Sequence, residues 1–201
     1  MRILFLNHNI AGVGTYQRAW NFGRELAGRG HEVTLVTTSR RARVRAQWST
    51  RDGVTVLEAP DLWNGPARSG WDPWNTWRRV ARLAGRSFDV VHAFDSRPVV
   101  IFPALAVRRA TGAALFMDWA DWWGRGGTIQ ERSGWLVRTA FGPIETWFEE
   151  AFRGQAVAST VISEALRRRC IGLGVDAARV LRVPDGCRAA AHDDAALDDK
   201  N

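Results

Sequence analysis

The sequence is poor in cysteine and contains no long run of apolar residues. Its two cysteines, Cys170 and Cys187, have neither the spacing of metal ligands nor the pattern of a disulfide framework, which agrees with a reducing compartment. No apolar run approaches the roughly 20 residues that span a bilayer, and the N-terminus lacks the basic start, apolar core and cleavage site of a secretory signal. These absences predict a cytoplasmic protein.

Lysine is almost absent as well, so the basic character of the chain comes from arginine. The 28 Lys and Arg residues outnumber the 21 Asp and Glu residues and give a formal net charge of +7. This balance favours an anionic partner, either phosphate groups, an anionic membrane face or nucleic acid. An arginine-rich proteome would produce the same composition.

Tryptophan is abundant, with eleven residues, and several of them lie close to arginines. The spacing of Trp74, Trp77 and Val80 predicts a helix over residues 74–86 with arginines on its other side. Such a helix fits a lipid interface, where indole rings lie at headgroup depth and arginine meets lipid phosphate. Packing of the same apolar side on the protein's own sheet is the commoner alternative, so the sequence leaves a peripheral membrane contact open.

The first 39 residues have the pattern of a strand, a tight turn, a helix and a second strand. Residues 2–9 are an apolar run of β-formers, and Gly12 and Gly14 precede a helical segment. Glycines at this place let a ligand approach the backbone, and the free N–H groups of a first helical turn stabilise a phosphate. A simple strand-to-helix turn is an equally good explanation. Gln17 at the third glycine position and Thr38-Ser39 after the second strand argue against NAD.

The rest of the chain continues the alternation of strands and helices. It predicts a doubly wound parallel α/β sheet of Rossmann-like type with six or seven strands. Residues 1–187 form one domain in this interpretation, and residues 188–201, which show no core periodicity, form a linker or tail. Further strands are expected at residues 53–59, 89–95, 113–117, 156–160 and 179–183, and further helices at 98–110, 131–152 with a break near Gly142-Pro143, and 163–173.

Polar residues follow several of these strands and are expected to meet at one edge of the sheet, where ligands of such folds bind. Asp118 and Asp121 are candidates for contact with such a ligand, and capping of the following segment or pairing with nearby arginine is the alternative. For His92 and Trp119, the alternative to contact with a ligand is packing against neighbouring side chains. The candidates are Gly12, Val13, Gly14 and Thr15 after the first strand, His92, Asp95 and Arg97 after the fourth, Asp118, Trp119 and Asp121 after the fifth, and Ser163 after the sixth.

The chain resembles the N-terminal domain of a GT-B fold, family 4 glycosyltransferase of the retaining type. The resemblance spans residues 2–187, and its motifs are individually weak but fairly specific in their order and spacing. The family's V-P-N-G turn is matched with Asp185 in place of asparagine. The motifs are the first strand with Gly12-Val13-Gly14, residues 24–36 (RELAGRGHEVTLV), 89–92 (DVVH), 161–163 (VIS) and 183–186 (VPDG).

The resemblance implies a role for each group of candidates. The loop of Gly12, Val13, Gly14 and Thr15 approaches the donor diphosphate or the reacting sugar. Asp118 and Asp121 lie near the acceptor hydroxyl, where either accepts a hydrogen bond or proton from it. The acceptor-binding candidates are His92, Asp95, Arg97, Trp119 and Ser163. A second GT-B domain, which binds most of the nucleotide-sugar, is absent from this sequence, so the chain is expected to be a fragment that works with such a domain in cis or in trans.

The function expected on this basis is acceptor binding in a nucleotide-sugar-dependent hexosyltransferase that acts on a cell-envelope or lipid-linked glycan. No metal or other cofactor is implied, because no D-x-D pair lies among the candidates and the GT-B arrangement uses backbone dipoles and cationic side chains. A nucleic-acid partner is not expected. The chain alone is expected to be inactive. The alternative is a non-catalytic module that binds a glycan or lipid headgroup, or docks a separate donor-binding domain.

Overall fold

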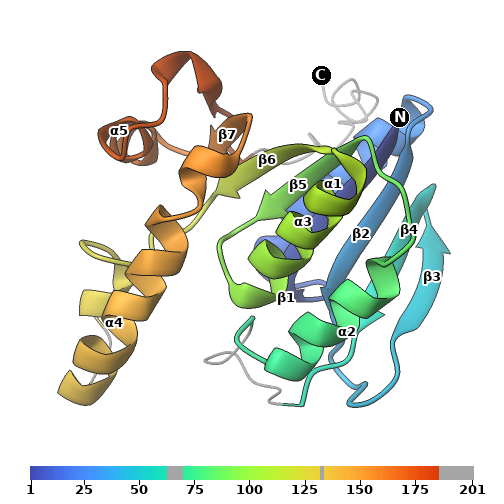
Figure 1. Ribbon diagram of the computed structural model, residues 1–201, viewed down its shortest axis with the longest axis horizontal. Helices are drawn as coiled ribbons and strands as arrows, with labels where there is room; N and C mark the ends of the chain where they lie inside the picture. Colours follow the sequence, from blue (N-terminus) through green and yellow to red (C-terminus); the bar gives the residue numbers. More distant parts are fainter. Residues whose placement is uncertain (63–69, 132–133, 186–201) are drawn as a thin grey trace, which may run out of the picture.

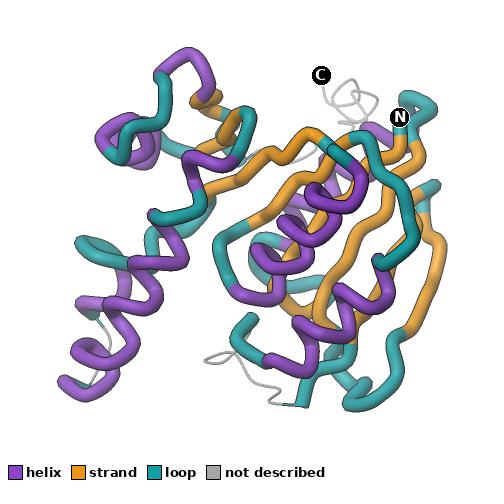
Figure 2. Tube along the Cα trace, in the orientation of Figure 1, coloured by secondary structure: helices purple, strands orange, loops and turns teal. Residues whose placement is uncertain are grey.

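A computed structural model describes residues 1–62, 70–131 and 134–185, so the proposed tail at 188–201 lies outside the described residues. Figure 1 shows one sheet with helices on both faces, and Figure 2 shows α4 and α5 extending to one side of it. The strands are β1 (Arg2–Ile10), β2 (Glu32–Thr38), β3 (Gln47–Arg51), β4 (Val54–Ala59), β5 (Val90–Phe94), β6 (Ala114–Trp119), β7 (Ala158–Val161) and β8 (Val180–Arg182). The α-helices are α1 (Tyr16–Gly28), α2 (Pro73–Leu83), α3 (Pro98–Thr111), α4 (Trp135–Glu150) and α5 (Glu164–Gly172).

The sheet has the order β3-β4-β2-β1-β5-β6-β7-β8, and all neighbours are parallel except β3 and β4. The chain moves outward from β1 in one direction and then returns to β5 on its other side. The predicted doubly wound α/β fold is therefore confirmed. This reversal places the carboxyl ends of β1 and β5 side by side, and ligands of open α/β sheets bind at such a point.

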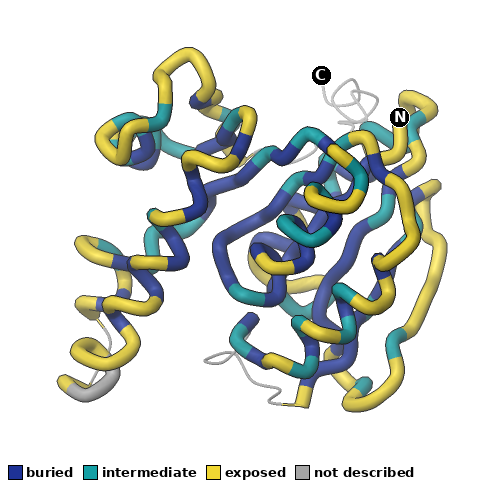
Figure 3. The backbone as a smooth tube through the Cα atoms, viewed as in Figure 1, coloured by how far each residue is buried: buried dark blue, intermediate teal, exposed yellow. Residues whose placement is uncertain are grey.

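Two hydrophobic clusters cover the two faces of the sheet because successive strand residues point to opposite sides. Ile3 and Phe5 of β1 pack with Trp20 of α1 on one face. Leu4 and Leu6 belong to the other cluster, to which α3 contributes its buried residues. Figure 3 shows the resulting buried centre and the exposed edge strand β3. The apolar core thus fixes the strands whose carboxyl ends carry the polar candidates.

The strand β3 was not predicted, and the reason is that all five of its residues are exposed. Without a buried face it has no alternating apolar pattern to reveal it. It pairs with β4 in an antiparallel hairpin through Asp52 and Gly53, whose φ angles are 48° and 76°. Positive φ at both central residues is the geometry that Asp-Gly favours in a two-residue hairpin turn.

The helix α2 buries a different side from the one that its apolar residues suggest. Its buried residues are Asn75, Arg79 and Leu83, whereas the Trp77 side chain is 55% exposed. Trp74 and Trp77 pack on each other with their ring centroids 5.1 Å apart. The tryptophans therefore lie outside the core, and a polar side chain determines how this helix sits on the sheet.

Arg79 is the polar side chain in question, and it is fully buried beneath the carboxyl ends of the central strands. Its Nη1 donates to the carbonyl oxygens of Asn7 (2.7 Å) and Val99 (3.1 Å), and its Nη2 donates to Thr38 Oγ1 (3.0 Å). Asn75 Oδ1 accepts from its Nε at 2.7 Å. Burial lowers the pKa of Arg79 to about 9. This arginine joins β1, β2 and α3 at the edge of the sheet where the strands have their carboxyl ends.

The expected break at Gly142-Pro143 is also absent, because α4 is continuous from Trp135 to Glu150. Pro143 has no N–H to donate to the carbonyl oxygen of Thr139, four residues earlier. The hydroxyl of Thr146 donates to the carbonyl oxygen of Gly142 at 2.8 Å. Proline in a helix interior costs a hydrogen bond and causes a local clash, but surrounding contacts can hold the helix together. These contacts come from two buried glutamates of α4, which are described below.

Candidate functional site

The glycine loop after β1 has the backbone conformation that its sequence predicts. Gly12 and Gly14 have φ angles of 88° and 60°, which L-amino acids with a Cβ rarely adopt. A Cβ at Gly14 would collide with the side-chain amide of Asn9, whereas nothing lies within 4 Å of the corresponding position at Gly12. Val13 between them is exposed. The loop is thus open to a ligand on one side and closely packed on the other.

Thr15 anchors this loop to the end of β5. Its hydroxyl donates to Asp95 Oδ2 at 2.9 Å and accepts from the amides of Asn7 (2.8 Å) and Asn9 (3.0 Å). Asp95 is only 2% exposed, and His8 Nδ1 lies 3.1 Å from its Oδ2. Burial alone would raise the pKa of Asp95, but the contacts with His8 and Thr15 outweigh it and lower that pKa. Asp95 therefore holds the glycine loop in place through its hydrogen bond with Thr15.

Asp95 also has a left-handed backbone with φ of 69°. A non-glycine residue in this region carries conformational strain of the order of 1–3 kcal/mol, and it persists only where surrounding contacts offset that strain. The hydrogen bond from Thr15 and the contact with His8 supply such contacts. The strained residue lies after the carboxyl end of β5, beside the glycine loop. Strained backbone of this kind is often found at functional sites.

Asp118 pairs with Arg18, a residue that the sequence analysis did not single out. The Nε and Nη2 atoms of Arg18 donate to the two carboxylate oxygens at 2.9 and 3.0 Å, and Thr160 also donates to this carboxylate. Asp118 is 0% exposed. With both oxygens engaged, Asp118 is placed to position Arg18. The only signal in the sequence was an arginine four residues after Gly14.

Arg18 links the rim of the sheet to the segment that follows β8. Its Nη1 donates to Asp185 Oδ1 and its Nη2 to the carbonyl oxygen of Val183, both at 2.8 Å. Burial alone would lower the pKa of Arg18, but its bonds to Asp118 and Asp185 raise it. The guanidinium therefore remains charged and joins α1, β6 and the expected domain-junction turn.

Asp121 lies in a cavity of about 250 Å³ between the glycine loop and this junction. Burial is the largest cause that raises its pKa, to about 6, and the nearby negative charge of Asp95 and Asp185 adds to it. A carboxylate with this pKa accepts a proton near neutral pH. The cavity is lined by Gly14, Thr15, Gln17, Arg18, Asn21, Ala120, Asp121, Ile162 and Asp185.

Arg97 is buried beside the rim. Its guanidinium carbon lies 5.1 Å from the ring centroids of both Trp71 and Trp123, and its Nη1 pairs with Glu145 Oε1 at 2.5 Å. These contacts join the loop before α2, the end of β5, the loop after β6 and helix α4. In this arrangement Arg97 has its charge neutralised within the protein.

Trp119 is also buried, with 1% of its surface exposed. Its Nε1 donates to Glu149 Oε1 at 3.0 Å, and the Arg153 guanidinium lies 4.1 Å from its ring centroid. Its ring therefore offers no open face to a sugar in this structure.

His92 and Ser163 also lie outside the cavity of Asp121. His92 is in the middle of β5, two residues before the strand ends, and its ring stacks on Phe94 with centroids 4.5 Å apart. Burial is the main cause that lowers its pKa, to about 4. The side chain of Ser163 accepts from the Leu166 N–H at 3.3 Å and caps α5, as its sequence position predicts. Among the described residues, no group of three or more His, Cys, Asp and Glu side chains is arranged to hold a metal ion.

The different surroundings of the two loop glycines give a testable prediction. Gly14→Ala introduces both an unfavourable φ and a collision with Asn9, so we expect it to destabilise the protein by about 2–3 kcal/mol. Gly12→Ala introduces the unfavourable φ alone and should cost about 1 kcal/mol. Urea denaturation of both variants measures the difference, and equal losses would contradict a close packing of Gly14.

The doubly wound sheet, with its anchored glycine loop and the segment that Arg18 holds, places the chain in a class of fold, the N-terminal domain of the GT-B type. More particularly, the chain belongs to the family of the glycosyl transferase 4-like domain, whose model matches residues 12–186. No curated protein sequence matches the chain. The family that the sequence resembles is thereby confirmed.

Solved structures share this fold at low sequence identity. Sucrose-phosphate synthase from Thermosynechococcus elongatus has a TM-score of 0.66 and 14% identity, over 93% of this chain and 48% of that one. The lipopolysaccharide outer core galactosyltransferase WaaB has a TM-score of 0.55 and 12% identity, over 95% and 47%. A UDP-N-acetylglucosamine 2-epimerase from Rickettsia bellii has a TM-score of 0.51 and 12% identity, over 92% and 45%. The chain spans about half the length of these structures, and the epimerase shows that the fold alone does not define the reaction.

Proposed function

We propose that this chain is the acceptor-side domain of a retaining, nucleotide-sugar-dependent hexosyltransferase. The observation that carries the proposal is the cavity of about 250 Å³ that Gly14, Arg18 and Asp121 line together. It combines a loop of backbone N–H groups, a buried guanidinium and a carboxylate of raised pKa. In the proposal, a donor-binding domain in the same polypeptide or in a separate one closes over this cavity.

The glycine loop is suited to the anionic end of the donor. Gly12 and Gly14 leave room for close approach, and the positive dipole end of α1 lies directly after this loop. When the bond from the sugar C1 to the diphosphate breaks, negative charge grows on the leaving oxygen. Donors held in advance at that place stabilise the charge, which is usually the largest catalytic contribution.

Asp121 is the group that we assign to the acceptor hydroxyl. The acceptor hydroxyl first donates a hydrogen bond to the Asp121 carboxylate. As the acceptor oxygen bonds to C1 of the donor sugar, the hydroxyl proton is transferred to that carboxylate. Asp118 and Asp95 have supporting roles in this mechanism, because their oxygens already bind Arg18 and Thr15. A nucleotide-sugar and a glycan are then the substrates, and neither a metal nor another cofactor takes part.

The acceptor that we propose is a cell-envelope or lipid-linked glycan at the inner face of the membrane. The net charge of +7 and the exposed Trp135 and Trp147 of α4 support a site close to an anionic surface. None of the helices in the described part of the chain is both long enough and apolar enough to cross a bilayer. The lipid contact in this proposal is therefore peripheral.

The proposal predicts that the isolated 201-residue chain folds but transfers no sugar. With its donor-binding domain present, it should transfer hexose with retained anomeric configuration, measured by NMR of the product. Turnover by the chain alone would contradict the division into two domains, and an inverted product would contradict the retaining mechanism. Glycan binding without transfer, even with the second domain, would favour a non-catalytic binding module.

A further inference from the structure

The helix α4 buries charged side chains and exposes apolar ones, the reverse of the usual arrangement in a surface helix. Glu145 and Glu149 are 4% and 3% exposed, whereas Phe141, Ile144 and Trp147 are 51%, 45% and 54% exposed. Amphipathic helices on soluble domains normally bury the apolar residues and expose the charged ones. Only Phe148 among the apolar residues of this turn joins the main hydrophobic cluster. The outer side of α4 therefore presents an apolar surface outside the hydrophobic core.

The buried glutamates determine this orientation. Glu149 accepts hydrogen bonds from Trp119 Nε1 (3.0 Å) and from the backbone N–H groups of Trp123 (2.9 Å) and Gly124 (2.8 Å). Glu145 pairs with the buried Arg97. Turning the apolar side inward would break these bonds and leave the buried Arg97 without its anionic partner, which costs several kcal/mol. The apolar side of α4 is thus held outward.

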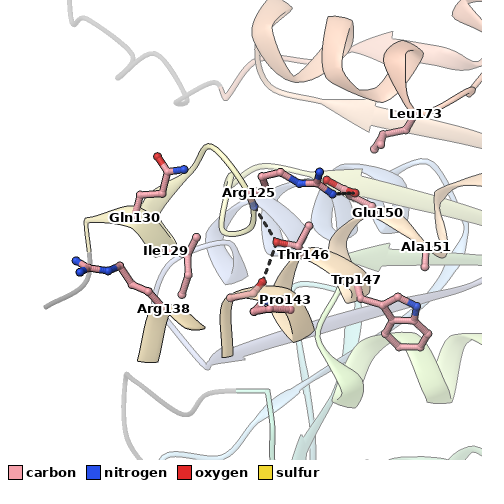
Figure 4. A pocket seen from close by; sticks show the side chains of 11 residues that line it. Arg125, Ile129, Gln130, Arg138, Pro143, Thr146, Trp147, Glu150, Ala151 and Leu173 are labelled. Carbon is pink, nitrogen blue, oxygen red and sulfur yellow. Dashed lines mark hydrogen bonds and ion pairs between the residues drawn. The ribbon is translucent and has the colours of Figure 1, made fainter. Parts of the chain in front are cut away.

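The charges beside this apolar side are mostly cationic. A groove of about 650 Å³ runs along α4, and Figure 4 shows Arg138 and Gln130 at one end and the ion pair of Arg125 with Glu150 toward the other. Arg125 and Arg138 are exposed, and Arg169 also pairs with Glu150. The described part of α4 contains no exposed carboxylate. Trp135 adds an aromatic ring, 66% exposed, at the start of the helix.

From these observations we infer that the outer side of α4 binds the surface of an anionic lipid bilayer. Phe141, Ile144 and Trp147 enter the boundary between headgroups and acyl chains, and Arg125 and Arg138 contact lipid phosphates. A second copy of the chain fits less well, because it would bring the arginines of both copies to one contact without an exposed carboxylate on α4 to offset them. The inference rests on the proposed membrane-proximal function and names its contact surface.

The test is sedimentation of the full 201-residue chain with vesicles of phosphatidylcholine, alone and mixed with phosphatidylglycerol. We expect the double variant Ile144→Ser/Trp147→Ser to lower the partition coefficient at least about tenfold on mixed vesicles. Arg138→Gln should lower it about fivefold on the mixed vesicles and leave it unchanged on the neutral ones. The matched control is Trp77→Ser on α2, whose side chain is as exposed as that of Trp147. It should leave vesicle binding unchanged.

Several outcomes would overturn the inference. One is that the unchanged chain does not bind the mixed vesicles. Another is that Trp77→Ser lowers the partition coefficient as much as the double variant does. A third is that the chain self-associates in ultracentrifugation and the double variant abolishes this self-association. Sugar transfer to a water-soluble acceptor, with the donor-binding domain present, is measured in parallel. Transfer without vesicle binding would overturn the role of α4 alone, and vesicle binding without transfer would overturn the enzymatic function alone.

Discussion

Replacing Asp121 with asparagine should lower kcat by about 10²- to 10⁴-fold when the donor-binding domain is present, because the amide cannot take the acceptor proton. The substitution preserves size, so the fold should remain intact. Asp52→Asn is the control, since Asp52 lies in an exposed hairpin turn where asparagine also tolerates a positive φ. A loss below about threefold would show that Asp121 does not accept this proton.

The pH dependence gives an independent test of the same role. Burial and neighbouring negative charge raise the pKa of Asp121 to about 6. Because the ionised form is the active one, the rate should fall about tenfold per pH unit as the pH decreases below that value. The Asp121→Asn variant should lack this acid limb. Persistence of the limb in the variant would assign it to another group.

The second large effect concerns stability. Arg97→Ala should lower the free energy of unfolding by about 3–5 kcal/mol, because it leaves Glu145 buried without its cationic partner. Urea denaturation measures this loss. Arg109→Ala, on the exposed end of α3, is the control and should change stability by less than about 0.5 kcal/mol.

A double variant separates loss of the ion pair from loss of packing. In Arg97→Met/Glu145→Leu neither charge is left without a partner, so it should be more stable than Arg97→Ala. A double variant that loses as much as the single one would indicate that the guanidinium stabilises the protein chiefly through its contacts with Trp71 and Trp123. An Arg97→Ala loss below about 1 kcal/mol would contradict the structural role of the pair altogether.

Much of the fold could be predicted from local patterns. The alternation of apolar strands and amphipathic helices predicted the doubly wound sheet, and Gly12 and Gly14 predicted a turn with positive φ. The errors occurred where burial did not follow local hydrophobicity. The strand β3 has no buried face, and α2 buries Arg79 while it exposes Trp77. Periodicity identifies the apolar side of a helix, but it does not reveal which side the rest of the protein covers.

The site was predictable only in part for the same reason. The carboxyl ends of the strands were expected to gather the polar residues, and the structure brings Asp95, Asp118 and Asp121 to that edge. Which of them has an oxygen available to a substrate depends on partners that are distant in sequence. Arg18 donates a hydrogen bond to Asp118, which lies 100 residues later in the sequence, and Thr15 donates one to Asp95, which lies 80 residues later.

The sequence by itself determined the fold class, the family and the glycine loop, because these depend on local pattern and on the order of motifs along the chain. The tertiary structure alone decided that Asp121 lies in the open cavity, that Arg18 joins the rim of the sheet to the segment after β8, and that α4 presents its apolar side outward. The physical reason is that buried charges require partners, and those partners are chosen by the order of the strands in space. In this protein the buried ion pair of Glu145 with Arg97 and the hydrogen bonds to Glu149, rather than hydrophobicity, set the orientation of α4.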